Sequence, residues 1–356
     1  MSFDKEMFKS NPNFKFKEVI RDLAECLGNS CQVETYKDKN EDTILVYAHF
    51  DMEHPLEDTH DLTFINLATN QEIKKIPQKD RVMCIRYFQN SIDKKRYLTS
   101  TDRKQHLNVY DLDDDYKCIL EVETKFELFI YSTVLIFEGP KKWVVCSSIG
   151  SNNITRVYDI DTKEPKDLSS TKELTVFYLD YWYNQKGEEN EKHNIIQCCK
   201  NKLVITSYPA DKNYFTNEFG EEEPYIQVGG YFEKNGQPHF ICSSTYGLVR
   251  AFNLETKQQV AEFKYEHGKV HLYGGPIVWW NEHYLLLNDF QQRRFITFCI
   301  DDDFKVHGKI LCPELENNKK IKKVKHPKYG ECLITCGTDW KVKLFTNRDI
   351  EAKEFD

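Results

Sequence analysis

A unit of nearly constant length recurs along this chain, and its spacing constrains the fold more than any other feature. Each unit contains a tetrapeptide similar to VYDL at 109–112. When the units are aligned on the first residue of this tetrapeptide, the steps between them are 45, 48, 47, 47, 46 and 47 residues. A recurrence this even indicates a protein built from repeated structural units. The aligned residues are Phe64, Val109, Val157, Val204, Ala251, Thr297 and Leu344.

Each unit has the pattern of short β-strands joined by polar turns. An apolar run ends in small residues, such as Ser147 and Ser148, and a polar tip and a second alternating strand follow. A turn rich in Asp, such as LDDDY at 112–116, then leads into a third strand, because Asp side chains can hydrogen-bond their own backbone. A less regular apolar segment precedes most units, as at 82–88. Four strands per unit, repeated seven times, predict an all-β, seven-bladed β-propeller with four-stranded antiparallel blades.

Composition agrees with this prediction and limits the classes of function. The aromatic residues make up 13% of the 356 residues, and large residues of this kind suit strands. The net charge of −8 argues against nucleic-acid binding, which needs a basic face. The polar N-terminal sequence does not resemble a signal peptide, and no apolar run approaches the ~20 residues of a membrane-spanning helix. We therefore expect a cytoplasmic protein that does not insert into membranes, with nuclear or ciliary association left open.

Three segments around the aligned residues resemble the WD40-repeat family. They are GTDWKVKLFTN at 337–347, STYGLVRAFNLETKQQV at 244–260 and STDRKQHLNVYDLDDDY at 100–116. The resemblance covers about 40–350 and implies a seven-bladed propeller that binds other proteins. The terminal Trp-Asp of the family is replaced by Tyr-Asp twice and by Phe-Asn once, and the Gly-His pair near each blade start is missing almost everywhere. The repeats are therefore divergent, and packing is expected to carry more of their stability.

The domain organisation follows from the need to protect the strand edges of a propeller. We expect residues 1–30 to form an N-terminal segment and residues 31–356 to form the propeller as a single domain. The segment FKFKEVI alternates phenylalanines with lysines, which favours a ring-closing strand near 14–20. The alternative closing strand, at 349–355, is weakly apolar. Residues 21–30 are expected to form a short helix or loop that leads to the innermost strand of the first blade at 31–37.

The tips of the blades supply the candidate binding residues. In the predicted fold, the tips between second and third strands lie on one face, together with the connections between blades. An exposed Trp flanked by Arg is typical of an interface hot spot. For Trp340 the alternative is packing against the neighbouring blade. The candidate protein-binding residues are Asp102, Arg103, Tyr246, Asp289, Arg293, Arg294, Asp339 and Trp340.

The long tip at 48–61 is a weaker candidate, for metal binding. It contains His49, His54 and His60 among several carboxylates, and zinc accepts both kinds of ligand. Their spacing matches no metal motif, so the alternative is a solvated acidic loop, and we predict neither a metal nor a cofactor. The cysteines are expected to be buried thiols.

Four further segments have more than one interpretation or a purely structural one. The lysine-rich run at 319–328 is compatible with a phosphate or an acidic partner, but its alternation with apolar residues favours a solvated turn and strand edge. The acidic loops at 183–194 and 214–225 either dock basic partners or are surface insertions. The Gly pair at 229–230 indicates close backbone approach within a strand.

The sequence favours a protein without a catalytic role. It contains neither a G-x-S-x-G elbow nor a P-loop. We predict a protein–protein interaction scaffold, or an adaptor subunit of a larger intracellular complex, whose partners are other proteins or peptides. The alternatives are a metal-dependent hydrolase, a small-molecule-binding propeller, or a reader of modified peptides that uses an aromatic cage.

Overall fold

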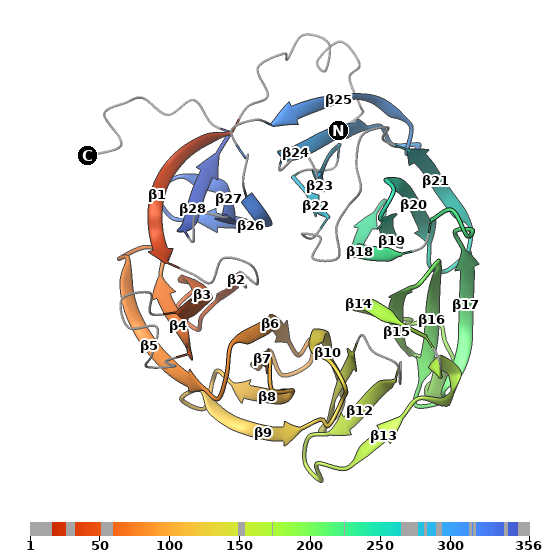
Figure 1. Ribbon diagram of the computed structural model, residues 1–356, viewed down its shortest axis with the longest axis horizontal. Coiled ribbons are helices and arrows are strands. Elements are labelled where there is room, and N and C mark those ends of the chain that lie inside the picture. Colours follow the sequence, from red (N-terminus) through yellow and green to blue (C-terminus); the bar gives the residue numbers. More distant parts are fainter. Residues whose placement is uncertain are drawn as a thin grey trace. The chain divides into compact units, whose positions relative to one another are not determined.

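The structure of the protein is a computed structural model. Within the residues that it describes, the chain forms seven four-stranded antiparallel sheets, so the predicted all-β, seven-bladed β-propeller is confirmed (Figure 1). These residues form no α-helix, and they include the single-turn 3-10 helices η1 (Ser169–Thr171) and η2 (Glu189–Glu191). The described residues are 16–25, 33–50, 60–148, 154–172, 174–223, 225–264, 277–280, 283–289, 294–312, 315, 318–337 and 341–347.

The chain divides into two compact units, and the second unit, Gln78–Gln259, contains blades 2 to 4 and most of blade 5. Blade 2 consists of β6 (Val82–Gln89), β7 (Arg96–Asp102), β8 (His106–Asp111) and β9 (Lys117–Glu123). Blade 3 consists of β10 (Ile130–Glu138), β11 (Lys141–Ser148), β12 (Thr155–Asp159) and β13 (Pro165–Asp167). Blade 4 consists of β14 (Val176–Tyr183), β15 (His193–Cys199), β16 (Lys202–Tyr208) and β17 (Lys212–Glu218). Blade 5 consists of β18 (Ile226–Lys234), β19 (Gln237–Ser244), β20 (Leu248–Asn253) and β21 (Gln259–Lys264).

The first unit contains Met1–Pro77 and Val260–Asp356, and with them blades 1, 6 and 7. Blade 1 consists of β2 (Val33–Lys37), β3 (Thr43–Phe50), β4 (His60–Asn66) and β5 (Gln71–Gln78). Blade 6 consists of β22 (Val278–Trp279), β23 (Tyr284–Asp289), β24 (Arg294–Ile300) and β25 (Val306–Cys312). Blade 7 consists of β26 (Asn318–His326), β27 (Gly330–Gly337), β28 (Lys341–Thr346) and β1 (Lys17–Glu25).

The repeat read from the sequence corresponds to one position in every blade. Each of the seven aligned residues lies in the third strand of its sheet, as Val109 does in β8 and Leu344 in β28. All seven side chains are buried. The fourth strands are more exposed than the third, as in β5 and β13. The even spacing therefore reflects one buried strand per blade that must occupy the same place in each sheet.

Strand β1 supplies the fourth strand of blade 7. It pairs antiparallel with β28, from Lys17 opposite Thr346 to Glu25 opposite Lys341, with two irregularities in register. The strand continues to Glu25, so the short helix or loop expected at 21–30 is wrong for 21–25. The alternative closing segment at 349–355 lies outside the described residues.

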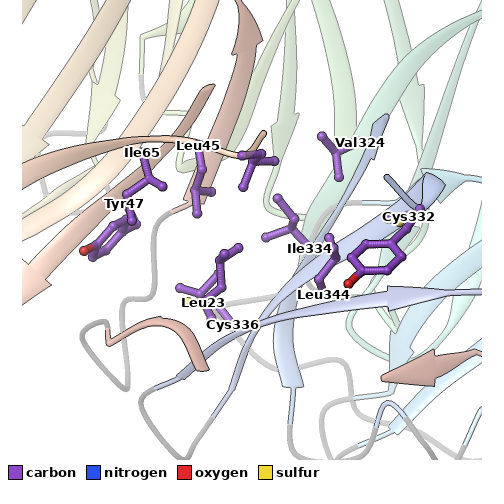
Figure 2. Close-up of a cluster of buried hydrophobic side chains, with 12 residues drawn as sticks. Leu23, Leu45, Tyr47, Ile65, Val324, Cys332, Ile334, Cys336 and Leu344 are labelled. Carbon is purple, nitrogen blue, oxygen red and sulfur yellow. The ribbon is translucent and has the colours of Figure 1, made fainter. Parts of the chain in front are cut away.

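The core of the first unit joins blades 1 and 7 (Figure 2). Leu23 of β1 lies there with Leu45 and Ile65 of blade 1 and with Ile334 and Leu344 of blade 7. In the second unit, equivalent apolar clusters lie between neighbouring blades, such as the one that contains side chains of both blade 3 and blade 4. Each sheet thus covers the apolar face of the next within its unit, which removes apolar surface from water.

Candidate functional site

The sequence-predicted tip residues that the structure describes divide into buried and exposed ones. Asp102 ends β7, Arg103 lies in the β7–β8 turn, and Tyr246 lies in the β19–β20 turn. Asp102 is 1% exposed, whereas Arg103 and Tyr246 are exposed. Asp289 ends β23 and Arg294 begins β24, so both lie at the tip of blade 6. Arg293, Asp339 and Trp340 lie outside the described residues.

Asp102 stabilises its own turn. One carboxylate oxygen accepts the backbone N–H of His106 at 2.9 Å, and the other lies 2.8 Å from Nδ1 of the same residue. The backbone N–H of Gln105 donates to the carbonyl of Asp102, which closes the turn. An Asp that bonds to backbone in this way holds a tight turn in one shape. The Asp102 carboxylate is therefore hydrogen-bonded within the turn, and Arg103 is the side chain that the turn exposes.

In the blade 5 tip, Ser244 and Glu223 stabilise the turn. Ser244 occupies the position of Asp102, and its hydroxyl accepts the backbone N–H of Leu248 at 3.0 Å. The hydroxyl also donates to the carboxylate of Glu223, which is 4% exposed although it comes from an acidic run in the sequence. Tyr246 is 37% exposed at the end of this braced turn. The role of Glu223 was not visible in the sequence, because three consecutive glutamates give no sign of which one is buried.

The tips of the second unit lie at the same end of its sheets, held by bonds between neighbouring blades. Thr101 Oγ1 donates to the carbonyl of Ile130 at 2.8 Å, between blades 2 and 3. Thr155 Oγ1 donates to Gln197 Oε1 at 2.9 Å, between blades 3 and 4. We call this end the tip face of unit 2. It consists of the turns at 103–105, 200–201 and 245–247 and of the connections at 79–81, 124–129, 168–172, 174–175, 219–223 and 225.

A second group of polar and aromatic residues joins the first strands of blades 2 to 5. Arg86 of β6 donates to the carbonyls of Thr133 in β10, at 3.0 Å, and of Leu179 in β14, at 2.5 Å. Its Nη2 lies 3.3 Å from Oδ1 of Asp180, and both side chains are largely buried. The other oxygen of Asp180 accepts the backbone N–H of Tyr231 in β18 at 3.1 Å. One ion pair therefore links four consecutive blades.

Aromatic rings surround the Arg86 guanidinium. Its central carbon lies 5.4 Å from the centre of the Phe88 ring and 5.5 Å from that of Tyr178. Burial, and then the nearby Asp180 carboxylate, raise the pKa of Tyr178, so its hydroxyl stays protonated and donates to Asp180 at 3.3 Å. These rings resemble part of an aromatic cage, but the cation against them belongs to the protein itself.

The structure describes only part of the histidine tip of blade 1. His60 is buried at the start of β4, and the backbone of His49 in β3 pairs with that of Asp61. His54 lies outside the described residues. Among the described residues, no group of three His, Cys, Asp or Glu side chains is placed to hold a metal ion.

The described cysteines match the expectation of buried thiols, with Cys118 as the exposed exception. Burial raises the pKa of Cys199 to about 12 and that of Cys299 to about 11. Thiols with such pKa values carry almost no reactive thiolate near neutral pH. They act as small apolar residues of the core.

The lysine-rich run at 319–328 is only in part the solvated turn and strand edge that the sequence favoured, with Lys325 and Lys328 exposed. It forms most of β26, and Lys322 contacts the carboxylate of Glu34, which is 7% exposed in β2. The ammonium of Lys323 donates to the carbonyl of Trp280 and lies 2.9 Å from Glu331. The expectation was wrong for these two lysines because the sequence cannot reveal a buried carboxylate on a distant strand.

The acidic loop of blade 4 also has partners within the chain. Lys212 pairs with Glu191 at 3.0 Å, and Lys186 pairs with Glu255 of blade 5 at 2.6 Å. These pairs are on the side of the sheets opposite to the tip face of unit 2, since the loop joins β14 to β15. They favour the interpretation of this loop as a surface insertion.

Comparisons with known proteins add no family to this description. No protein-family model and no curated protein matches the chain. In the part that the structure describes, no helix has the length and apolar character needed to cross a bilayer.

Proposed function

We propose that this protein is a non-catalytic interaction platform, a scaffold or adaptor subunit, that binds other proteins or peptides through the tip face of unit 2. One observation carries the proposal. Arg103 and Tyr246 are exposed on turns that buried side chains hold in place, Asp102 with His106 in one and Ser244 with Glu223 in the other. Tyr and Arg are the residue types most often found at interface hot spots.

Rigid presentation of these side chains has a physical advantage. Ordering a loop on binding costs conformational entropy, and a turn that is already braced avoids much of this cost. The Arg86 network supports the same property, because it ties together the four blades that carry the tips. A surface of this kind recognises a partner without any moving part.

We further infer that the chain is a divergent member of the WD40-repeat family, working in the cytoplasm as part of a larger complex. The even repeat, the four-stranded blades and an Asp at the tip of blade 2 support the family assignment. The guanidinium of Arg86 itself lies against the aromatic rings. It occupies the place that the cation of a bound modified peptide would need, which argues against a reader of modified peptides.

The proposal is tested by co-purification from the native cell with quantitative mass spectrometry. The wild-type chain is compared with Arg103→Ala/Tyr246→Ala and with a control on the opposite side of the same unit, Lys141→Ala/Tyr183→Ala. We expect specific proteins that the wild type and the control retain and that the tip variant loses by at least tenfold. If every co-purifying protein is retained equally by the two double variants, and both melt like the wild type, the tip face of unit 2 is not the binding surface.

A further inference from the structure

The side of unit 2 opposite to its tip face contains a buried histidine between a hydroxyl and a carboxylate. His193 begins β15, and its side chain is 3% exposed. Its Nδ1 lies 2.7 Å from the hydroxyl oxygen of Tyr181 in β14. Its Nε2 lies 4.0 Å from Oε1 of Glu138, which ends β10. The two nitrogens of one imidazole ring thus face a side chain of blade 4 and a side chain of blade 3.

This imidazole is neutral near pH 7 and carries its hydrogen on Nε2. Burial lowers the pKa of His193, the Glu138 carboxylate offsets this in part, and Lys192 lowers the pKa further. Burial, and then Tyr183 and Glu138, raise the pKa of Tyr181, so its hydroxyl stays protonated and donates to Nδ1. The other tautomer would turn the lone pair of Nε2 toward the Glu138 carboxylate, which electrostatic repulsion disfavours.

The other ionisable groups around His193 keep their charge when the pH falls from about 7 to about 5, because phenols and carboxylates ordinarily titrate outside this range. Tyr208 lies opposite His193 in β16, and burial, then Asp159 and Glu138, raise its pKa to about 12. The Lys166 ammonium lies 5.8 Å from the centre of the Tyr208 ring. The same fall in pH therefore acts on this cluster through His193.

We propose that His193 is a proton-controlled latch between blades 3 and 4. In the neutral state, Glu138 lies beyond hydrogen-bond distance of Nε2, and its side chain is 37% exposed. A proton from solvent binds Nδ1 in acid, so the hydroxyl of Tyr181 turns away and its oxygen becomes the acceptor. The positive ring then attracts the Glu138 carboxylate into a charge-assisted hydrogen bond with Nε2–H. The turn between β10 and β11, which follows Glu138, is thereby tied to blade 4 in acid only.

The first test reads the tautomer of His193 in the full-length wild-type chain. Two-bond correlation of ring protons with ring nitrogens by NMR distinguishes the two neutral tautomers, and His193→Gln identifies the signals. His239 is an internal reference, since burial lowers its pKa as well and its Nδ1 lies 2.9 Å from the Gln237 carbonyl, which can only accept. We expect hydrogen on Nε2 of His193 and on Nδ1 of His239.

The second test follows the titration midpoint of His193 in variants. Glu138→Gln removes the carboxylate that favours the charged ring and should lower the midpoint by at least about half a pH unit. Tyr181→Phe removes the donor that favours the neutral ring and should raise it. The matched control is Glu164→Gln, an exposed carboxylate in the β12–β13 turn at the same end of blade 3, which should leave the midpoint unchanged.

The third test is the nuclear Overhauser contact between the ring protons of His193 and the methylene protons of Glu138, which should strengthen below the midpoint. Hydrogen on Nδ1 of neutral His193 would overturn the latch, and this result comes from the wild type, so it requires no variant to fold. Equal midpoints in wild type and Glu138→Gln would overturn it too. A contact that does not change with pH would show that Glu138 is not drawn in, and the proposal would fall.

Discussion

Arg86 and Asp180 form an ion pair between the first strands of blades 2 and 4, although 94 positions separate them in the sequence. Blade 3 lies between these strands and contributes the Thr133 carbonyl to the same guanidinium. The pair is largely buried, with side-chain exposures of 22% and 14%. It therefore fixes the spacing of three blades at once, and its loss should be felt by all of them.

Replacing one member of this pair should destabilise the protein strongly. Arg86→Met leaves the Asp180 carboxylate buried without its cation, and we expect a loss of about 3 kcal/mol in the free energy of unfolding. Urea denaturation followed by tryptophan fluorescence measures it. The control is Lys117→Met, which removes an exposed pair with Asp114 at 3.5 Å and should cost less than about 1 kcal/mol. Similar losses in the two variants would show that the buried pair has no special role.

The double variant Arg86→Met/Asp180→Leu separates the pair itself from the cost of an unpaired charge. It removes both charges, so it should recover part of the stability that Arg86→Met loses. Recovery would assign the loss to the uncompensated carboxylate. The explanation is contradicted if the double variant loses more free energy of unfolding than the single variants Arg86→Met and Asp180→Leu lose together.

Stability should depend on pH differently once Lys322 is replaced. Burial lowers the pKa of Lys322 to about 7 in the folded protein, from the usual value of 10.5. Above pH 7 the unfolded state therefore binds more protons than the folded state, so Lys322 makes the free energy of unfolding rise with pH. Lys322→Met removes this contribution. The free energy of unfolding of the variant should therefore fall with pH, relative to wild type, by up to about 1.4 kcal/mol per pH unit.

This pH dependence is measured by urea denaturation between pH 7 and pH 9. Lys323→Met is the matched control, since it removes the neighbouring lysine, which pairs with the half-exposed Glu331. The control should run parallel to wild type. A Lys322→Met profile that also runs parallel would mean that Lys322 keeps its proton throughout the range.

Strand β1 should contribute to stability through Leu23. This side chain is 6% exposed in the core shared by blades 1 and 7 (Figure 2), and Leu23→Ala should cost about 3 kcal/mol. Ile73→Ala, at a position that is 43% exposed in β5, should cost less than about 1 kcal/mol. The comparison uses thermal and urea denaturation. A Leu23→Ala variant as stable as Ile73→Ala would mean that β1 does not hold blade 7.

Gly229 should not tolerate even one added methyl group. A Cβ at this position in β18 would lie 2.4 Å from the tip of the Phe240 ring and 3.2 Å from the Ile241 carbonyl oxygen. We expect Gly229→Ala to lower the free energy of unfolding by about 2 kcal/mol through overpacking. Adding Phe240→Leu should restore part of the loss, because the ring is then absent. No restoration would point to the backbone oxygen as the source of the clash.

The parts of the fold that follow from local periodicity could be predicted from the sequence. Val109, Val157 and Val204 are buried in third strands because each must fill the same apolar place in its own sheet. The close approach at Gly229 was also visible, since a Gly within a strand often marks such contact. Placing Arg103 and Tyr246 at exposed tips required only the order of strands and turns.

Side-chain partners far apart in the sequence could not be predicted. From the sequence, Asp102 and Arg103 are both predicted to bind a partner. In the structure, however, the Asp102 carboxylate bonds to His106 of its own turn. It treated Lys322 as solvated and did not distinguish Glu223 from its neighbours. Each of these residues meets a partner that only packing brings near.

By itself, the sequence determined the number of blades, the strands within them and the turns that lie at the tips, because a repeated pattern of apolar and polar residues acts through local geometry. Only the tertiary structure decided which charges are buried and paired, as in Arg86 with Asp180 and Lys322 with Glu34. The free energy of a charge depends on its neighbours in space, and those neighbours come from strands that the sequence keeps far apart.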